Sequence, residues 1–278
     1  VRNVSCKKNP GLCATSATNM LDVLIRRAAD RGLLVSLSHD QLQARNSIYP
    51  PSLWYNSIYS EELVIRIWDA LIARYKNQWN VFAIDLKNEP SYESSKEPST
   101  WGNSNKSSDW NKAAERMIRR IVAFKGLFFV DGLKYGSDLN NVRQYPIDSG
   151  NSSLNNRIIY TPHCYGPIIF DISVFKTVNF PEYLDSQYMQ EYGFLTSKGL
   201  PVLIGEWGAA HDPGSLGEKW NKWYVEWLRN KCLTNNFYWS LDPNSEYTSG
   251  LLEKDWKTPD ERKLELLNRV QPHPTKFK

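Results

Sequence analysis

Two short segments, each ending in a glutamate, most constrain what this 278-residue chain can fold into. Residues 81–90 read VFAIDLKNEP, with the acid at Glu89, and residues 201–208 read PVLIGEWG, with the acid at Glu206. Each begins as an apolar run of strand length and breaks at Pro or Gly shortly after its glutamate. In a parallel α/β sheet, and above all in a β/α barrel, such strand ends carry the chemistry. The segments therefore predict two carboxylates in one cleft, as glycoside hydrolysis needs.

Six segments with strand character alternate with helical patterns, which predicts β/α units and a parallel sheet. We expect strands near residues 33–38, 81–87, 126–131, 157–163, 201–206 and 236–241. No repeat or linker-like segment divides the chain, so we expect a single domain over residues 1–278. The fold class that fits is the TIM (β/α)8 barrel, which needs eight strands. Because the first regular element is a helix, we expect an N-terminally truncated barrel of about six β/α units.

Apolar residues at spacings of three and four predict helices between these strands. We expect helices from Thr15 to Gly32, from Ser60 to Tyr75 and from about Ser108 to Phe124, and then near residues 184–198, 216–231 and 259–270. In the second helix, the spacing assigns the buried face to Leu63, Ile67, Ala70, Leu71 and Tyr75.

Charge and hydropathy exclude several classes of function. The net charge is only +4, and basic clusters such as Arg26-Arg27 fall in helical patterns, so we expect solvated helix faces and no nucleic-acid surface. No run of about 18 apolar residues predicts a membrane span. Aromatic residues make up 13% of the chain. They fit either a large aromatic core or sugar-binding surfaces, because aromatic faces cover the apolar faces of pyranose rings.

Cysteines and glycosylation sequons bear on the compartment. Cys6 and Cys13 lie in a segment that suits a small disulfide loop, and no Cys/His spacing predicts zinc. Sequons at Asn3, Asn105 and Asn151 fall in polar, loop-like stretches. Since the chain begins at Val1 without a signal peptide, we interpret it as a mature form or fragment of a secreted, extracellular glycoprotein.

Several predicted strand ends carry groups that fit one pocket. Besides the two glutamates, they bear His39, Asn88, His163, Tyr165 and Trp239. Each alone has a structural interpretation, because Asn and Pro are common in turns and a His or Trp often packs in a core. Together, at the ends of strands in one chain, they favour an active site.

These motifs resemble glycoside hydrolase family 5, the cellulase family. The resemblance lies in LKNEP (86–90), HCY (163–165), IGEWG (204–208), YWS (238–240) and TSGLLEKDW (248–256). SLWY (52–55) and SDW (108–110) resemble the bacterial-type endo-β-1,4-glucanase branch, and the match runs from about residue 15 to the end.

The resemblance implies a retaining hydrolase that cleaves internal β-1,4-glucosidic bonds of cellulose or related β-glucans. It implies that Glu89 is the general acid/base and Glu206 the nucleophile. The carboxyl groups should then lie ~5–5.5 Å apart, and like charges that close raise one pKa, which we expect to be that of the acid. No metal or organic cofactor is implied, and we expect a monomer with a polysaccharide or oligosaccharide partner.

The resemblance also implies substrate contacts. Asn88 would contact the sugar at the scissile bond, and His39, His163 and Tyr165 would line the same subsite, with Tyr165 near the nucleophile. Trp239 would form the floor under a glucosyl unit.

The chain departs from the family pattern. The family begins with two more β/α units, whose second strand carries an arginine that hydrogen-bonds the nucleophile, and no stretch before His39 supplies it. Such an arginine keeps a carboxyl ionised by lowering its pKa. The family also often has a histidine where this chain has Ser91. Two alternatives stay open: a β-mannanase or other β-glycanase of the family, and an inactive glycan-binding remnant.

Overall fold

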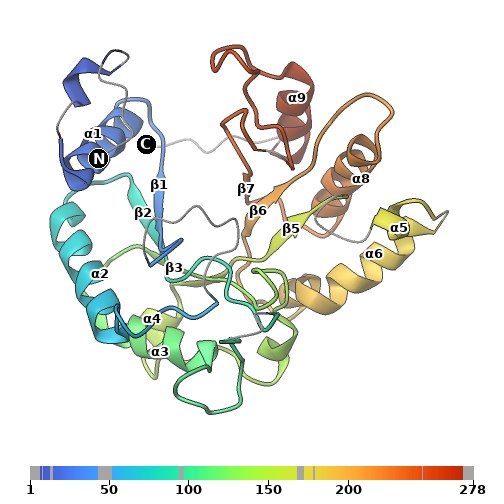
Figure 1. Cartoon of the computed structure of the whole chain (residues 1–278). Coiled ribbons are helices and arrows are strands. Elements are labelled where there is room, and N and C mark those ends of the chain that lie inside the picture. Colours follow the sequence, from blue (N-terminus) through green and yellow to red (C-terminus); the bar gives the residue numbers. More distant parts are fainter. Residues whose placement is uncertain are drawn as a thin grey trace.

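A curved wall of parallel strands lies inside the molecule, and helices cover it on the outside (Figure 1). The computed structural model describes residues 7, 9–12, 15–42, 52–93, 97–167, 172–177, 179–245 and 247–271. Cys6, Cys13 and Asn3 lie outside these residues, so the expected disulfide loop and the first sequon lie outside the described structure.

Two groups of strands make up the wall. The first pairs β1 (Val35–Ser38), β2 (Val81–Asp85), β3 (Leu127–Val130) and β4 (Ile158–Tyr160) in that order. The second pairs β5 (His163–Tyr165), β6 (Ile204–Gly208) and β7 (Asn236–Tyr238). All of these pairings are parallel. A parallel bridge between Tyr160 and Val202 joins the two groups.

The expected strand over 157–163 is therefore two strands. β4 ends at Tyr160 and β5 begins at His163, with Pro162 between them. Proline has no N–H to donate to a ladder, so the strand cannot continue its pairing through this position. β4 pairs with β3, whereas β5 pairs with β6. The other five strands lie where the sequence predicted them, within a few residues.

The wall is open between its first and last strands. Among the residues described, β1 pairs only with β2, and β7 pairs only with β6. The described residues thus provide six strand positions of a TIM-barrel-type fold, as expected from the strand count.

The helices occupy the segments in which helical spacing was found. They are α1 (Ala17–Ala29), α2 (Glu61–Tyr75), α3 (Trp110–Arg120), α4 (Ser152–Asn155), α5 (Ile172–Phe175), α6 (Phe180–Tyr188), α7 (Phe194–Ser197), α8 (Leu216–Asn230) and α9 (Glu261–Val270). A π-helical turn, Met189–Gly193, joins α6 to α7, and 3-10 turns cover Pro10–Leu12 and Asn140–Arg143. The Ser60 hydroxyl accepts a hydrogen bond from the Leu63 N–H, which confirms the predicted cap of α2.

The buried face predicted for α2 is confirmed at Tyr75 and partly at Leu71, which packs against the core, but it is wrong at Ile67 and Ala70, which are exposed. Ile67 is 48% exposed, and the buried residues are Val64, Ile65, Trp68, Ile72 and Tyr75. Trp68 is the largest side chain of the helix, and burying it removes more apolar surface from water than burying Ile67 would.

Aromatic side chains fill much of the core on the α8 side. Tyr224 stacks on Trp220 with ring centroids 4.7 Å apart and on Trp227 at 5.8 Å, and Tyr188 and Tyr192 pack beside them. These five rings are buried. The high aromatic content therefore serves the core to a large extent.

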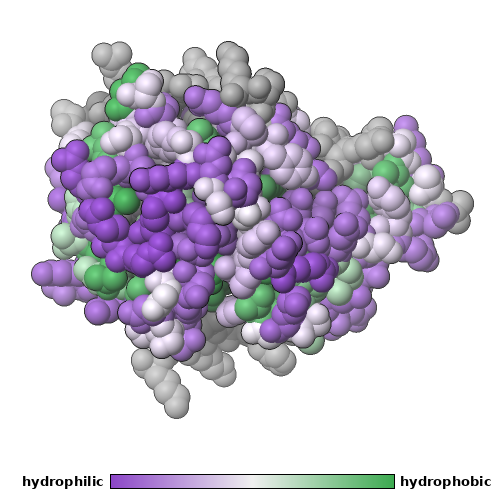
Figure 2. Space-filling model, turned by 90° about the horizontal axis from the view of Figure 1, so that it is seen from below, coloured by the Kyte–Doolittle hydropathy of each residue, from purple (hydrophilic) through white to green (hydrophobic). Residues whose placement is uncertain are grey.

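The helix-covered surface is mostly hydrophilic, with small scattered apolar areas, on the side shown in Figure 2. Arg116 pairs with Glu61 and Arg120 with Glu62, linking α3 to α2, while Arg26 and Arg27 are exposed on α1. The basic clusters are thus solvated helix faces, as expected. None of the described helices is long and apolar enough to cross a membrane.

Candidate active site

The carboxyl ends of β2, β5 and β6 bring four of the predicted residues together. His163 of β5 is paired in register with Glu206 of β6. His163 Nδ1 lies 3.0 Å from Glu89 Oε1 and 3.6 Å from Glu206 Oε2. An oxygen of Glu89 and one of Glu206 lie within 4.8 Å of each other. The two carboxyl groups are therefore close neighbours, with the imidazole beside both.

Tyr165 holds the second carboxyl group. Its hydroxyl donates a hydrogen bond to Glu206 Oε2, and alternation along β5 puts Tyr165 on the same face as His163. Glu206 and Glu89 keep 16% and 17% of their side-chain surface exposed, so both are reachable from solvent.

The pKa of Glu206 is raised to about 7. Burial is the largest cause and the charge of Glu89 adds to it, while His163 and the Tyr165 hydrogen bond oppose them. We expected the raised pKa on the acid and an ionised Glu206, and this expectation is wrong for Glu206. No arginine pairs with Glu206 among the described residues, so less positive charge offsets its burial than in the family pattern.

Glu89 occupies a backbone conformation that side chains rarely adopt. Its φ is 54°, in the left-handed region. Its N–H donates to Asp131 Oδ2 at 3.0 Å, which holds the turn after β2 in place. Strained backbone of this kind persists where surrounding contacts fix it, and it is common at functional sites.

Two glycines lie against the ring of His163. A Cβ at Gly136 would lie 2.8 Å from His163 Cγ, and one at Gly205 would lie 2.9 Å from its Cδ2 and Nε2. The close approach explains why the IGEWG motif needs glycine before its acid. Although burial disfavours its charged form, the carboxylates of Asp131, Glu206 and Glu89 raise the pKa of His163 well above its usual value.

Asn88 and His39 meet through the backbone. The Asn88 N–H donates to the His39 carbonyl at 3.0 Å, and the Asn88 side-chain amide donates to Asp40 Oδ1 at 3.2 Å. Burial and the nearby Lys87 lower the pKa of His39 to about 4, so its imidazole is neutral at pH 7. The structure gives no hydrogen bond from either side chain to Glu89 or Glu206.

Trp239 directly follows β7, the strand next to β6. Its N–H donates to the Trp207 carbonyl at 2.9 Å, which fixes it one residue beyond the paired residues Trp207 and Tyr238 of the ladder. Its side chain is 46% exposed, so the indole is available to a ligand.

Three buried charged residues behind the site were not predicted to belong to it. Asp85, Lys87 and Asp131 are buried, and the Lys87 ammonium donates to the carbonyls of Asn88 and Asp40. The sequence did contain a signal for them: each lies in or directly after an apolar strand segment, and a charged residue buried there needs a partner.

One group of three among the described residues has the spacing of a metal site. Ligand atoms of Glu89, His163 and Glu206 all lie within 4.8 Å of one another. A metal takes deprotonated donors, and here His163 and Glu89 already lie at hydrogen-bond distance from each other. We assign no metal to the group, and the expected absence of a cofactor stays a prediction.

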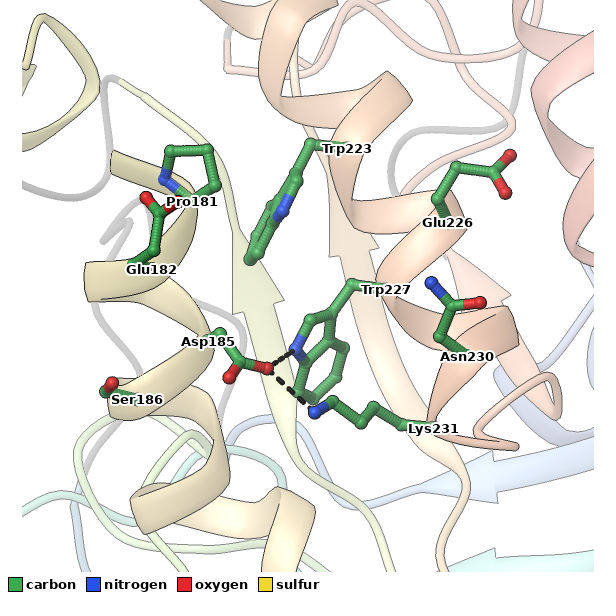
Figure 3. Close-up of a pocket in the computed structure, with 9 residues that line it drawn as sticks. All are labelled: Pro181, Glu182, Asp185, Ser186, Trp223, Glu226, Trp227, Asn230 and Lys231. Atoms are coloured by element: carbon green, nitrogen blue, oxygen red, sulfur yellow. Dashed lines mark hydrogen bonds and ion pairs between the residues drawn. The ribbon is translucent and has the colours of Figure 1, made fainter. Parts of the chain in front are cut away.

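A surface groove of about 430 Å³ lies elsewhere, between α6 and α8 (Figure 3). Asp185 Oδ1 accepts from Trp227 Nε1 at 2.6 Å and pairs with Lys231 Nζ at 2.9 Å, so its polar groups satisfy one another. Neither carboxylate of the site lines this groove.

Comparisons with known proteins identify the family of this chain. The family described as cellulase (glycosyl hydrolase family 5) matches residues 3–245. The chain is 32% identical to an endoglucanase from Paenibacillus polymyxa, with 96% of the chain and 68% of that protein covered. It is 31% identical to the major extracellular endoglucanase of Xanthomonas campestris, with 96% of the chain but only 56% of that protein covered.

Solved structures are similar over nearly the whole chain. The catalytic domain of the major endoglucanase from Xanthomonas campestris superposes with a TM-score of 0.86 at 30% identity, covering 97% of this chain and 79% of that one. A cellotetraose complex of an endocellulase from Pyrococcus horikoshii gives a TM-score of 0.88 at 30% identity, covering 96% and 77%. The chain therefore belongs to the cellulase family of glycoside hydrolases, glycosyl hydrolase family 5.

Proposed function

We propose that this chain is a retaining endo-β-1,4-glucanase, with Glu89 as general acid/base and Glu206 as nucleophile. The observation that carries the proposal is the pair of carboxyl groups on neighbouring parts of the strand wall, Glu89 after β2 and Glu206 within β6, with oxygens within 4.8 Å of each other. Retaining enzymes hold their acids ~5–5.5 Å apart, whereas inverting ones leave ~6.5–9.5 Å for a water molecule. The short separation favours retention.

The reaction proceeds in two displacements. In the first, a Glu206 oxygen bonds to the anomeric carbon while the glycosidic C–O bond breaks and Glu89 gives its proton to the leaving oxygen. In the second, Glu89 takes a proton from water, the water oxygen bonds to the anomeric carbon, and Glu206 is released. Tyr165 keeps one Glu206 oxygen hydrogen-bonded, which leaves the other to attack.

The remaining predicted residues position the sugar. Asn88 lies directly before the acid, and its side-chain amide, which donates to Asp40 Oδ1, is the group that we assign to a sugar hydroxyl. The exposed indole of Trp239 supplies an apolar face under a glucosyl ring. His39, neutral at pH 7, lines the same subsite beside Asn88.

Similarity to named relatives supports the choice of β-1,4-glucan. The relatives are endoglucanases, and the related Pyrococcus horikoshii endocellulase was solved with cellotetraose. We therefore place β-1,4-glucan before β-mannan as substrate.

We further propose that one copy of the chain is a single domain that works as a monomer, since both acids come from one chain. Secretion as a glycoprotein is supported by the exposure of Asn105 and Asn151 and by a relative named for its extracellular location. The Asn151 side chain also caps α4 by accepting a hydrogen bond from the Ser153 N–H, so a glycan on Asn151 would be attached at the N-terminus of α4.

Two observations favour the alternative of a glycan-binding remnant: the open wall and the raised pKa of Glu206. Reducing-sugar release from carboxymethylcellulose, mannan and laminarin, with Glu206→Gln as blank, tests the proposal. Release from cellulose alone supports an endoglucanase, and faster release from mannan reassigns the substrate. Binding of cellohexaose without release from any glycan would establish the remnant.

A further inference from the structure

Asp131 contacts three parts of the site at once. It follows β3, and its side chain is 1% exposed. Its Oδ2 accepts the backbone N–H of Glu89 at 3.0 Å and lies 3.3 Å from His163 Nε2. Its Oδ1 accepts the Thr161 hydroxyl at 2.5 Å. The Asp131 carbonyl is itself fixed by the Trp110 indole N–H at 3.0 Å.

Asp85 offers an internal comparison. It is buried as well, but it accepts only the Ser38 hydroxyl, and its Oδ1 has no hydrogen-bond partner among the described residues. Burial and the charge of Asp131 raise the pKa of Asp85 well above its usual value. A carboxylate that accepts three donors is stabilised in its charged form far more than one that accepts a single hydroxyl. Burial raises the pKa of Asp131 as well, but His163, the Thr161 hydroxyl and the Glu89 N–H oppose this rise, so the contacts favour the charged form of Asp131 more than Ser38 favours that of Asp85.

We propose that Asp131 is a positioning residue for the reaction: it fixes the left-handed turn at Glu89 and holds His163 with Nε2–H toward itself, so that Nδ1 faces Glu89. The proposal rests on the proposed function, in which Glu89 is the acid/base. Asp131 cannot reach the sugar, because it is buried behind both residues. Its effect on the reaction passes through them.

The arrangement determines where a proton sits. With Nε2–H donated to Asp131, a neutral His163 has only a lone pair on Nδ1, and it can bond Glu89 Oε1 only if Glu89 carries the proton. With His163 charged, Nδ1–H donates to an ionised Glu89. In both states one proton lies between Nδ1 and Oε1, which are 3.0 Å apart. The other charged or titratable groups around this pair are Glu206, Asp85, Lys87, Asp40 and Tyr165.

Asp131→Asn tests the proposal, with Asp85→Asn as the matched control of equal size and burial. Removing the Asp131 charge should lower the midpoint of His163 titration by about one pH unit or more. It should lower kcat/KM on cellohexaose about 100-fold through kcat, with KM unchanged. Asp85→Asn should leave both readouts near those of the unmodified chain, because the Asp85 side chain accepts the Ser38 hydroxyl and hydrogen-bonds neither Glu89 nor His163. With four histidines in the chain, ¹⁵N-histidine NMR reads His163 directly, and His163→Gln assigns its signal.

Each outcome decides something. A loss of kcat/KM in Asp131→Asn without movement of the His163 midpoint would reduce Asp131 to a structural residue and overturn the proposal. If Asp131→Asn does not fold, the unmodified chain still decides, because a neutral His163 protonated on Nδ1 overturns the proposed orientation. If no form of the chain hydrolyses any β-glycan, the proposed function fails. The NMR measurement still shows whether Asp131 orients His163, because it does not depend on activity.

Discussion

His163 Nδ1 lies 3.6 Å from Glu206 Oε2, and this is the ion-pair contact that the described residues offer to Glu206. The same nitrogen lies closer to Glu89, at 3.0 Å. One imidazole therefore interacts with both carboxyl groups, and its interaction with Glu206 is the weaker of the two because the distance is longer. This division explains why burial prevails and the pKa of Glu206 rises to about 7.

The pH dependence of catalysis follows from this pKa. Glu206 must be ionised to attack, so kcat/KM should be full above its pKa and fall tenfold per pH unit below about 7. The measurement is a pH profile of kcat/KM on an aryl cellobioside, with rates divided by the concentration of active sites trapped by a fluoroglycoside. Circular dichroism across the same range separates titration from unfolding. An acidic limb at pH 4–5, the ordinary range of a carboxyl group, would contradict the expectation.

Tyr165→Phe should weaken the nucleophile. The variant removes the hydroxyl that donates to Glu206, so the pKa of Glu206 should rise further and the acidic limb should move upward. Loss of a hydrogen bond to a charged group predicts a fall in kcat/KM of about 10- to 100-fold. Tyr238→Phe, on the adjacent strand β7, is the matched control, because its hydroxyl bonds the Ala209 carbonyl at 3.5 Å and not Glu206. Equal effects of the two changes would argue against the proposed role of Tyr165.

Azide should distinguish the two acids. Glu206→Gln should abolish turnover, whereas Glu89→Ala should keep activity on substrates whose leaving group needs no proton. Azide should accelerate Glu89→Ala and give a β-glycosyl azide, because it attacks the glycosyl-enzyme without a general base. Proton NMR of the product reads the anomeric configuration. A β-azide product from Glu206→Ala would exchange the two roles.

Gly205→Ala should disturb His163. The added methyl group would lie 2.9 Å from the imidazole, closer than side chains tolerate, so the ring or the strand must shift. We expect a destabilisation of about 1–3 kcal/mol and a loss of activity. Thermal unfolding and kcat/KM measure the two effects. Gly11→Ala is the control, since a Cβ there has no neighbour within 4 Å. If Gly205→Ala changed neither stability nor activity, the His163 ring would have space for the methyl group and the expectation would be wrong.

The edges of the wall that are unpaired among the described strands should make part of this chain aggregate, while the fraction that stays soluble is the proposed monomer. Leu33 next to β1 is 56% exposed and Leu241 beyond β7 is 64% exposed, and unpaired strand edges with exposed apolar side chains promote aggregation. We expect low soluble yield and large species in size-exclusion chromatography. Leu33→Lys and Leu241→Lys should reduce the amount of these large species, whereas Ile58→Lys, on a loop, should leave it unchanged. A monodisperse, fully active chain with a cooperative melt would contradict this.

The sequence predicted what depends on local signals. The two strand segments that carry Glu89 and Glu206 were found because Pro and Gly interrupt apolar runs, although β2 ends before Glu89, at Asp85, and β6 continues past Glu206 to Gly208. The cap at Ser60 was found because a hydroxyl before a helical pattern is a local feature. The division at Pro162 was missed, although proline marks it, since the apolar pattern continues on both sides.

What depends on packing in three dimensions could not be read from the sequence. Trp68 is buried and Ile67 is exposed on α2, because burying the larger ring removes more apolar surface from water. The three contacts of Asp131 come from residues 42, 30 and 32 positions away in the chain, so no local pattern reveals them. The pKa of Glu206 was misjudged for the same reason, because burial outweighs the surrounding charges only in the folded site.

The two proposed acids stand on different halves of the strand wall. Glu89 follows β2 in the four-stranded part, and Glu206 lies in β6 of the three-stranded part, and the bridge from Tyr160 to Val202 joins the parts beside Pro162. The way the two parts join here therefore contributes to the gap between the carboxyl groups. A gap wider by a few ångströms would admit water on the far side of the sugar and invert the new hydroxyl at the anomeric carbon. The anomeric configuration of the product thus depends on the joint at Pro162, a residue that has no backbone N–H to donate.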